Sequence, residues 1–153
     1  MNRLLPYLER VFLATLAVAF ILQLTGSELP ILMSLSLAGL GITFFLSAYR
    51  PLDIEPEEGE ELGDFNELLA LTIIPKILWI GTSVATIGIL LSTLELGNDG
   101  YVTLLYVGLI TISIATMIQL GLKVTGTKYI NATFPVFFRA IPTLLIVAYI
   151  LFG

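Results

Sequence analysis

The chain has 153 residues, of which 57% are hydrophobic and only 12% are charged. Soluble domains usually carry about 25% charged residues, so this composition indicates one domain whose surface mostly faces lipid. Histidine and cysteine are both absent, which removes disulfides, thiol chemistry and the commonest ligands for zinc, haem and copper. We therefore expect no cofactor and no metal site. The sequence also has no broad basic face for nucleic acid.

Five apolar runs are each long enough to cross a bilayer core, which takes about 20 helical residues. The predicted spans cover residues 6–25, 29–49, 67–94, 101–122 and 132–152. The first run lacks a signal-peptide cleavage pattern, so we interpret it as a retained span. Pro75 predicts a kink in the long third span. The predicted fold is all-α: a polytopic membrane bundle of about five transmembrane helices.

The basic residues predict the orientation of this bundle. With five spans, the N-terminus, the acidic loop 51–66 and the link 123–131 share one side. That side holds Arg3, Arg10, Arg50, Lys123 and Lys128. The other side holds no lysine or arginine, and Lys76 and Arg139 lie in the half-membrane nearest the basic side. We predict an N-terminus in the cytoplasm, a C-terminus outside it, and a multi-pass protein of the cell (inner) membrane.

A faint internal repeat relates the first two predicted helices to the next two. Polar turns at 24–28 and 95–99 end the first and third spans, and each precedes a helix with a small-residue step, at Gly39 and Gly108. Both hairpins would enter from the cytoplasm and return. The pattern favours two parallel-repeat hairpins plus a fifth helix.

Lys76 and Arg139 are the most informative polar positions, because a charge at the centre of a span costs about 2.5–3.5 kcal/mol on insertion scales. One interpretation is a cationic pocket, open to the cytoplasm, that binds a carboxylate, a phosphate or a lipid head group. The other is that both side chains extend to the head groups along their alkyl stems. Glu9, an acid at the inner edge of the first span, either pairs with one of these cations or makes a local contact with its neighbours at the interface.

Eight of the twelve acidic residues lie between Asp53 and Glu67. The densest part holds Glu55, Glu57, Glu58, Glu60 and Glu61. Docking to a basic partner is the functional interpretation, and a solvated loop of repelling charges is the alternative. The spacing lacks the order of a calcium-binding loop.

Two further observations concern function. Gly81, Ala85 and Gly88 lie near one face of the third span, which is typical of close helix packing in membranes. We find no nucleophile–base pair, Walker loop or zinc-protease motif, so we expect no enzyme.

One stretch of the chain resembles a known membrane hairpin. The segments Ile21-Leu-Gln-Leu-Thr-Gly, Leu32-Met-Ser-Leu-Ser-Leu-Ala-Gly-Leu and Phe44-Phe-Leu-Ser-Ala-Tyr-Arg-Pro resemble the transmembrane hairpin of the gliding-motility motor subunit family, GldL. The resemblance covers residues 21–51, with a fainter echo at 87–117. That family's motors carry an acidic residue in the second helix, whereas residues 29–49 here have none. The resemblance thus implies the hairpin fold without the proton-driven motor role.

Two functions follow as hypotheses. The first is a small non-enzymatic subunit or helper that packs in the lipid bilayer with partner membrane proteins or with copies of itself. The second is a small transporter or channel with a cytoplasm-facing cationic site at Lys76 and Arg139.

Overall fold

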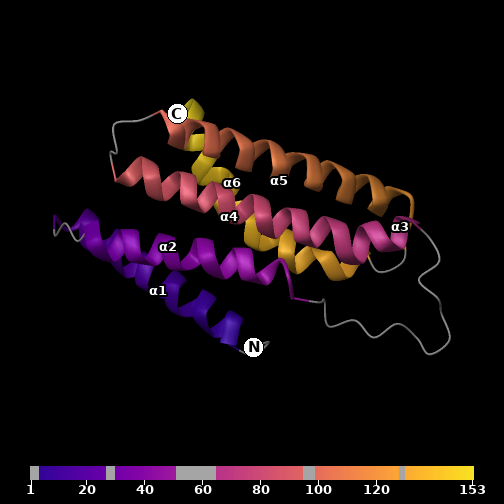
Figure 1. Ribbon diagram of the computed structural model, residues 1–153, viewed down its shortest axis with the longest axis horizontal. Helices are drawn as coiled ribbons and strands as arrows, with labels where there is room; N and C mark the ends of the chain where they lie inside the picture. Colours follow the sequence, from indigo (N-terminus) through magenta and orange to yellow (C-terminus); the bar gives the residue numbers. More distant parts are fainter. Residues whose placement is uncertain (1–3, 27–29, 51–64, 95–98, 128–129) are drawn as a thin grey trace.

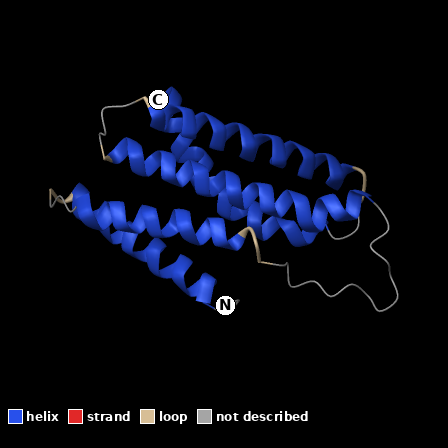
Figure 2. Ribbon diagram, in the orientation of Figure 1, coloured by secondary structure: helices blue, strands red, loops and turns tan. Residues whose placement is uncertain are grey.

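The computed structural model describes residues 4–26, 30–50, 65–94, 99–127 and 130–153. Throughout these residues the regular structure is helical, with no strand (Figures 1 and 2). Five helical segments in the described ranges are long and apolar enough to cross a membrane. The all-helical class and the predicted number of spans are therefore confirmed. In lipid only a helix or a closed barrel satisfies every backbone polar group, which is why these apolar runs fold as helices.

The helices begin and end within two residues of the predicted spans. Their bounds are α1 Leu4–Leu24, α2 Pro30–Ser47, α3 Phe65–Leu68, η1 Leu69–Ile73, α4 Ile74–Thr93, α5 Gly100–Val124, η2 Ile130–Thr133 and α6 Phe134–Phe152. Prolines occupy the first turn of α2 and α6, where the missing N–H would have no helical partner anyway. The elements α3, η1 and α4 form one continuous span from Phe65 to Thr93.

The structure accommodates Pro75 with a wider helical turn. Proline cannot donate a backbone hydrogen bond to the carbonyl four residues before it. Directly before it, η1 is a π-helical turn, and the Ile74 N–H donates to the carbonyl of Leu69, five residues back. The irregularity predicted at Pro75 is thus a π turn inside an unbroken span, a form typical of helices that absorb one displaced hydrogen bond.

Helix α5 ends just before a glycine whose backbone adopts the left-handed conformation. Gly126 has a φ of 73°, a region that other residues adopt at a cost. The Thr127 N–H donates to the carbonyl of Leu122, and the Gly126 N–H donates to that of Lys123. This pair of bonds is a Schellman cap, which is why the span stops here.

Helix α4 is the centre of the bundle. It packs against α2, α5 and α6, whereas α1 packs chiefly along α2. Figure 1 shows the α1–α2 hairpin on one side of α4 and α5 on the other, with successive long helices running in opposite directions.

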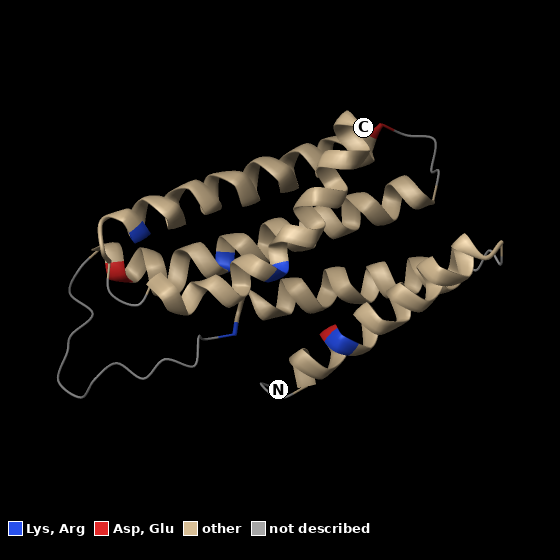
Figure 3. Ribbon diagram, turned by 180° about the vertical axis from the view of Figure 1, so that it is seen from behind, with Lys and Arg blue, Asp and Glu red and all other residues tan. Residues whose placement is uncertain are grey.

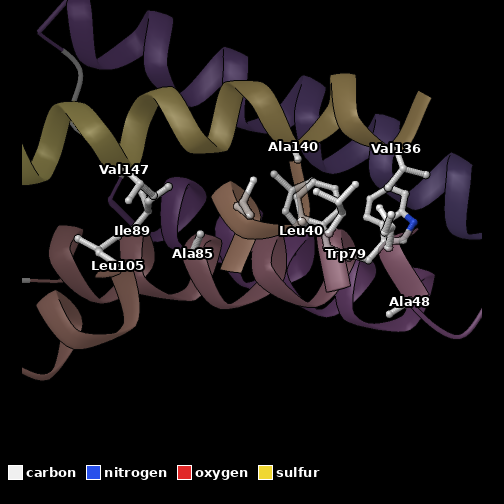
Figure 4. Packing of buried hydrophobic residues seen from close by; sticks show 14 of the residues in the cluster. Leu40, Ala48, Trp79, Ala85, Ile89, Leu105, Val136, Ala140 and Val147 are labelled. Carbon is white, nitrogen blue, oxygen red and sulfur yellow. The ribbon is translucent and has the colours of Figure 1, made fainter. Parts of the chain in front are cut away.

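The buried apolar core follows α4 along its length. Ile89 of α4, Leu105 of α5 and Val147 of α6 meet at one end of this row, and Trp79 and Val136 lie at the other (Figure 4). The side chains of Leu105 and Val147 are completely buried. The core therefore joins α4 to two helices that follow it in the chain.

Small residues bring α4 and α5 into backbone contact. A Cβ placed on Gly108 of α5 would lie 2.7 Å from the Cβ of Ala85 and 2.8 Å from its Cα. A Cβ on Gly88 would lie 2.9 Å from Leu105, and one on Gly81 would lie 3.0 Å from Ile112. The small face predicted in the third span is thus used for packing inside the chain, as in other membrane helices that approach closely.

The two predicted hairpins use their small-residue steps in a similar way. Gly39 of α2 receives the ring of Phe12 from α1, and Gly108 of α5 receives Ala85 from α4. In each hairpin the second helix therefore offers a glycine to the first. The internal repeat itself stays a prediction.

Most buried hydroxyl groups bond to backbone carbonyls. Five donate to the carbonyl four residues earlier in their own helix: Ser36, Thr43, Ser47, Thr82 and Thr86. The Ser83 hydroxyl instead crosses from α4 to α2 and donates to the Gly41 carbonyl at 2.7 Å. These hydroxyls satisfy themselves without water, so their presence in the spans does not indicate a pore.

We predict that Gly108→Ala destabilises the bundle. The added methyl would meet the Ala85 backbone, which cannot move aside as a flexible side chain can, so we expect a loss of about 1–3 kcal/mol. Thermal unfolding in detergent micelles, followed by circular dichroism, measures the change. Gly121→Ala on the same helix is the matched control, because nothing lies within 4 Å of its added methyl. Equal stability of the two variants would contradict the proposed contact.

Candidate functional site

The charged residues of the described ranges are distributed unevenly along the bundle. Figure 3 shows no lysine or arginine at the end that carries the C-terminus, whereas basic positions occur from the middle of the bundle to the opposite end. This asymmetry places the polar features described next in the basic half.

An ion pair joins the first and last long helices. Nη1 of Arg139, in α6, lies 3.3 Å from Oε2 of Glu9, in α1. The Glu9 side chain is only 9% exposed, whereas that of Arg139 is 47% exposed. A buried carboxylate needs such a partner, because an unpaired charge removed from water costs several kcal/mol. The pair therefore connects the α1–α2 hairpin to α6.

Trp79 of α4 supports the same arginine from a third helix. The Arg139 guanidinium carbon lies 5.9 Å from the centroid of the indole ring, within the range of a cation–π contact. The other contact of the ring is Phe44 of α2, stacked at 5.5 Å between centroids with an interplanar angle of 30°. Trp79 is thus a packing residue, as the sequence predicts, and also holds Arg139.

These side chains line a polar cavity of about 210 Å³. Its wall comes from the start of α1, the end of α2, the middle of the third span and the first turns of α6. The polar part of the wall consists of Glu9, Ser47, Arg50, Trp79 and Arg139. The charged members of the wall are thus two arginines and one glutamate.

The structure separates the two cations that the sequence analysis grouped together. Arg139 lines the cavity and pairs with Glu9, but Lys76 does not line it. Lys76 is exposed on the outside of α4, and it has no ion pair among the described residues. Its exposed position agrees with a side chain that extends along the bundle surface. The cavity described above therefore includes Arg139 and Glu9 of the predicted site but not Lys76.

Two cavity residues were missed as site residues by the sequence analysis. Arg50 was counted only among the cations of the basic side, and Ser47 carried no signal of its own. The ends of α1 and α2 meet near the first turns of α6, and this meeting depends on tertiary packing. The five glutamates predicted for partner docking, Glu55, Glu57, Glu58, Glu60 and Glu61, lie outside the described residues.

A second buried polar contact lies between α5 and the turn before α6. Gln119 Nε2 donates to the hydroxyl of Thr133 at 2.7 Å, and that hydroxyl donates to the carbonyl of Ile130. Gln119 and Thr133 are almost completely buried, and Gln119 Oε1 has no hydrogen-bond partner within the described part of the chain. This contact fixes η2 against α5.

A further cavity, of about 270 Å³, opens between α5 and α6. Its wall includes Ile112, Met117, Phe137 and Leu144, with the hydroxyls of Ser113 and Thr116. It holds no charged side chain, so an apolar chain such as a lipid tail is the occupant that its chemistry favours.

The described residues define a class: a helical bundle of membrane-spanning length with a charged cavity in its basic half. Comparisons with protein-family models, curated proteins and solved structures found no match to this chain. The resemblance of residues 21–51 to the gliding-motility hairpin therefore stays a prediction.

We predict that the two members of the ion pair differ in their effect on stability. Arg139→Leu leaves the buried Glu9 carboxylate without its partner, so we expect a loss of about 1–3 kcal/mol. Glu9→Leu leaves the half-exposed Arg139 able to reach solvent, and we expect a smaller loss. The double variant should recover part of the stability lost by Arg139→Leu. Unfolding in detergent micelles provides the measurement.

Lys76→Leu is the control for this comparison, because it also removes one cation from the basic half. It should leave stability nearly unchanged. A Glu9→Leu loss as large as that of Arg139→Leu would show that the pair is not asymmetric as described.

Proposed function

We propose that this chain is a small non-enzymatic subunit of the cell (inner) membrane, which packs laterally against partner membrane proteins. The observation that carries the proposal is the position of α1. Within the most apolar 18 residues of α1, only 11% are buried inside the bundle, against 22–50% for the other four spans. A helix held so loosely by its own chain leaves most of its surface for other membrane components.

The outward surface of α1 has the chemistry of a helix-packing face. Ala14 and Ala17 are exposed and lie beside the exposed Val18 and Ile21. Small residues let a second helix approach closely, and in lipid such van der Waals contact is a main source of association energy. The surface thus supports a protein partner better than it supports a purely lipid-facing helix of large side chains.

The side chains inside the bundle argue against catalysis in the described residues. The buried hydroxyls of Ser36, Ser47 and Thr82 donate to backbone carbonyls. Each of these hydroxyl protons is thus engaged by the helix backbone, whereas a nucleophile donates its proton to an activating base. The Glu9–Arg139 pair holds opposite charges together, which is a structural or binding arrangement.

Transport through the charged cavity is the second candidate, and the geometry supports it less. Phe44 and Trp79 stack directly behind the cavity, and the buried Leu40 and Leu78 follow in the core. An ion crossing here would have to displace this aromatic stack and then pass through apolar packing. Lys76, the second cation of the transport hypothesis, does not line the cavity.

The orientation that we propose puts the basic half of the bundle at the cytoplasm, following the positive-inside rule. The natural absence of cysteine lets single substitutions test it. We expect Asp99→Cys to react in intact cells with a membrane-impermeant maleimide. Thr127→Cys should react only after the cells are permeabilised. Labelling of Thr127→Cys in intact cells would reverse the orientation.

We predict that α1 contacts a partner protein in the native membrane. Ala17→Cys, labelled with a maleimide photo-crosslinker and irradiated in native membranes, should give a discrete protein adduct. Ile114→Cys is the matched control, because Ile114 is 52% exposed and lies near the middle of α5. The proposal fails if α1 gives no protein adduct or if both positions give the same adducts.

A further inference from the structure

We propose that the cavity between α1, α2, α4 and α6 binds a phosphate-bearing anion, and that the head group of an anionic phospholipid is its natural source. The inference requires the bundle to lie in a membrane, but it does not depend on the partner proposed for α1. It rests on the hydrogen-bond donors in the cavity wall and on the position of the cavity in the bundle.

Arg139 supplies the first set of donors. Its planar guanidinium carries five N–H groups, and the contact with Glu9 at 3.3 Å engages one edge of it. Almost half of the side chain remains exposed. An arginine fork matches the oxygens of a phosphate in a bidentate manner, so Arg139 can hold Glu9 and an anion together.

Trp79 supplies a second, independent donor. The residue is only 7% exposed and forms part of the cavity wall. Its indole nitrogen has no hydrogen-bond partner in the described ranges, although a buried indole N–H usually has one. In Figure 4 this nitrogen lies on the side of the ring away from Leu40, at the end of the core where Ala48 and Val136 lie. Indole only donates, so a ligand that bonds to this nitrogen has to offer an acceptor.

The chemistry of these donors points the same way. Arg139 and Trp79 both line the cavity, and both present N–H groups that can only donate. Such donors favour an anion over a cation or a neutral apolar molecule. A cavity of about 210 Å³ has room for a phosphate group with a small substituent.

The position of the cavity favours a lipid head group as the source of that anion. Glu9 and Arg139 are each five residues from the start of their helices, or about 8 Å at 1.5 Å per residue. Ser47 is the last residue of α2, and Arg50 follows it. On α1, α2 and α6 the wall therefore lies within two turns of a helix end, the level where phosphates of the bilayer gather, and Trp79 forms its deeper part. Basic pockets between membrane helices at this level are typical sites for anionic lipids.

Trp79 is the single tryptophan of the chain, so its fluorescence reports directly on the cavity. The full-length protein in non-ionic detergent micelles is titrated with dioctanoyl phosphatidylglycerol, dioctanoyl phosphatidylcholine and inorganic phosphate. We expect a saturable change of Trp79 emission with phosphatidylglycerol and a much weaker response to phosphatidylcholine. Saturation by inorganic phosphate at similar concentrations would support the anion site with a soluble source instead.

Two variants separate binding from a merely structural role of the ion pair. Arg139→Gln should weaken phosphatidylglycerol binding about tenfold, because it removes the charged fork. Glu9→Gln should strengthen binding about threefold or more, because Arg139 loses its competing carboxylate. A purely structural pair predicts no gain in affinity from Glu9→Gln.

Lys76→Gln is the matched control, since it removes a cation of the same half without altering the cavity wall. It should leave the affinity unchanged. Far-UV circular dichroism checks that each variant is folded, and the Glu9→Gln/Arg139→Gln double variant replaces Arg139→Gln if that variant does not fold. The inference is overturned if saturating phosphatidylglycerol leaves Trp79 emission unchanged. It is also overturned if phosphatidylcholine binds equally well, or if Glu9→Gln fails to raise the affinity.

Discussion

Helices surrounded by lipid gain little from hiding apolar side chains, so they associate through close packing and hydrogen bonds. In this bundle α4 satisfies that requirement on two sides. Its Ala85 touches Gly108 of α5, and its Ser83 hydroxyl donates to the Gly41 carbonyl of α2. Because both contacts involve backbone atoms, they leave α4 little freedom to shift. The position of Trp79, one turn before Ser83, and hence the inner wall of the cavity, follow from this placement of α4.

The charged residues obey a related constraint, because a charge removed from water needs a partner. Glu9 lies on the one helix that has few contacts with the rest of the bundle, and its carboxylate turns towards Arg139 rather than outwards. The same contact therefore satisfies a buried acid and joins α1 to α6. Arg139 can play both parts because its guanidinium also lies over the face of Trp79. A lysine, with a compact ammonium group and no planar fork, would not reproduce this geometry.

Hydrophobicity and charge were enough to predict the five spans, their bounds to within two residues, and Glu9 as one candidate counter-ion for Lys76 or Arg139. They could not distinguish Arg139 from Lys76, because both are single cations at similar depth and only the helix faces differ. For the π turn at Leu69–Ile73, the sequence indicated only that Pro75 would disturb the helix. The Gln119–Thr133 contact joins residues 14 apart across a turn, and no periodicity marks it. These features depend on which helix faces contact one another, and tertiary packing determines those contacts.

The cavity lies between two contacts of α1: the Phe12 ring packs against α2, and Glu9 pairs with Arg139 of α6. Phe12 packs on Gly39 and fixes α1 to α2 about one turn beyond Glu9. Closer to the start of α1, the long polar side chains of Glu9 and Arg139 bridge the space between α1 and α6. In the rest of the bundle, apolar side chains fill the space between helices. Arg139 can therefore accept an anion beside Glu9 at the cavity without disturbing the Phe12–Gly39 contact. A half-exposed guanidinium at this level has donors to spare while the bundle keeps its packing, whereas the hydroxyls and glycines around α4 are already engaged in helix contacts.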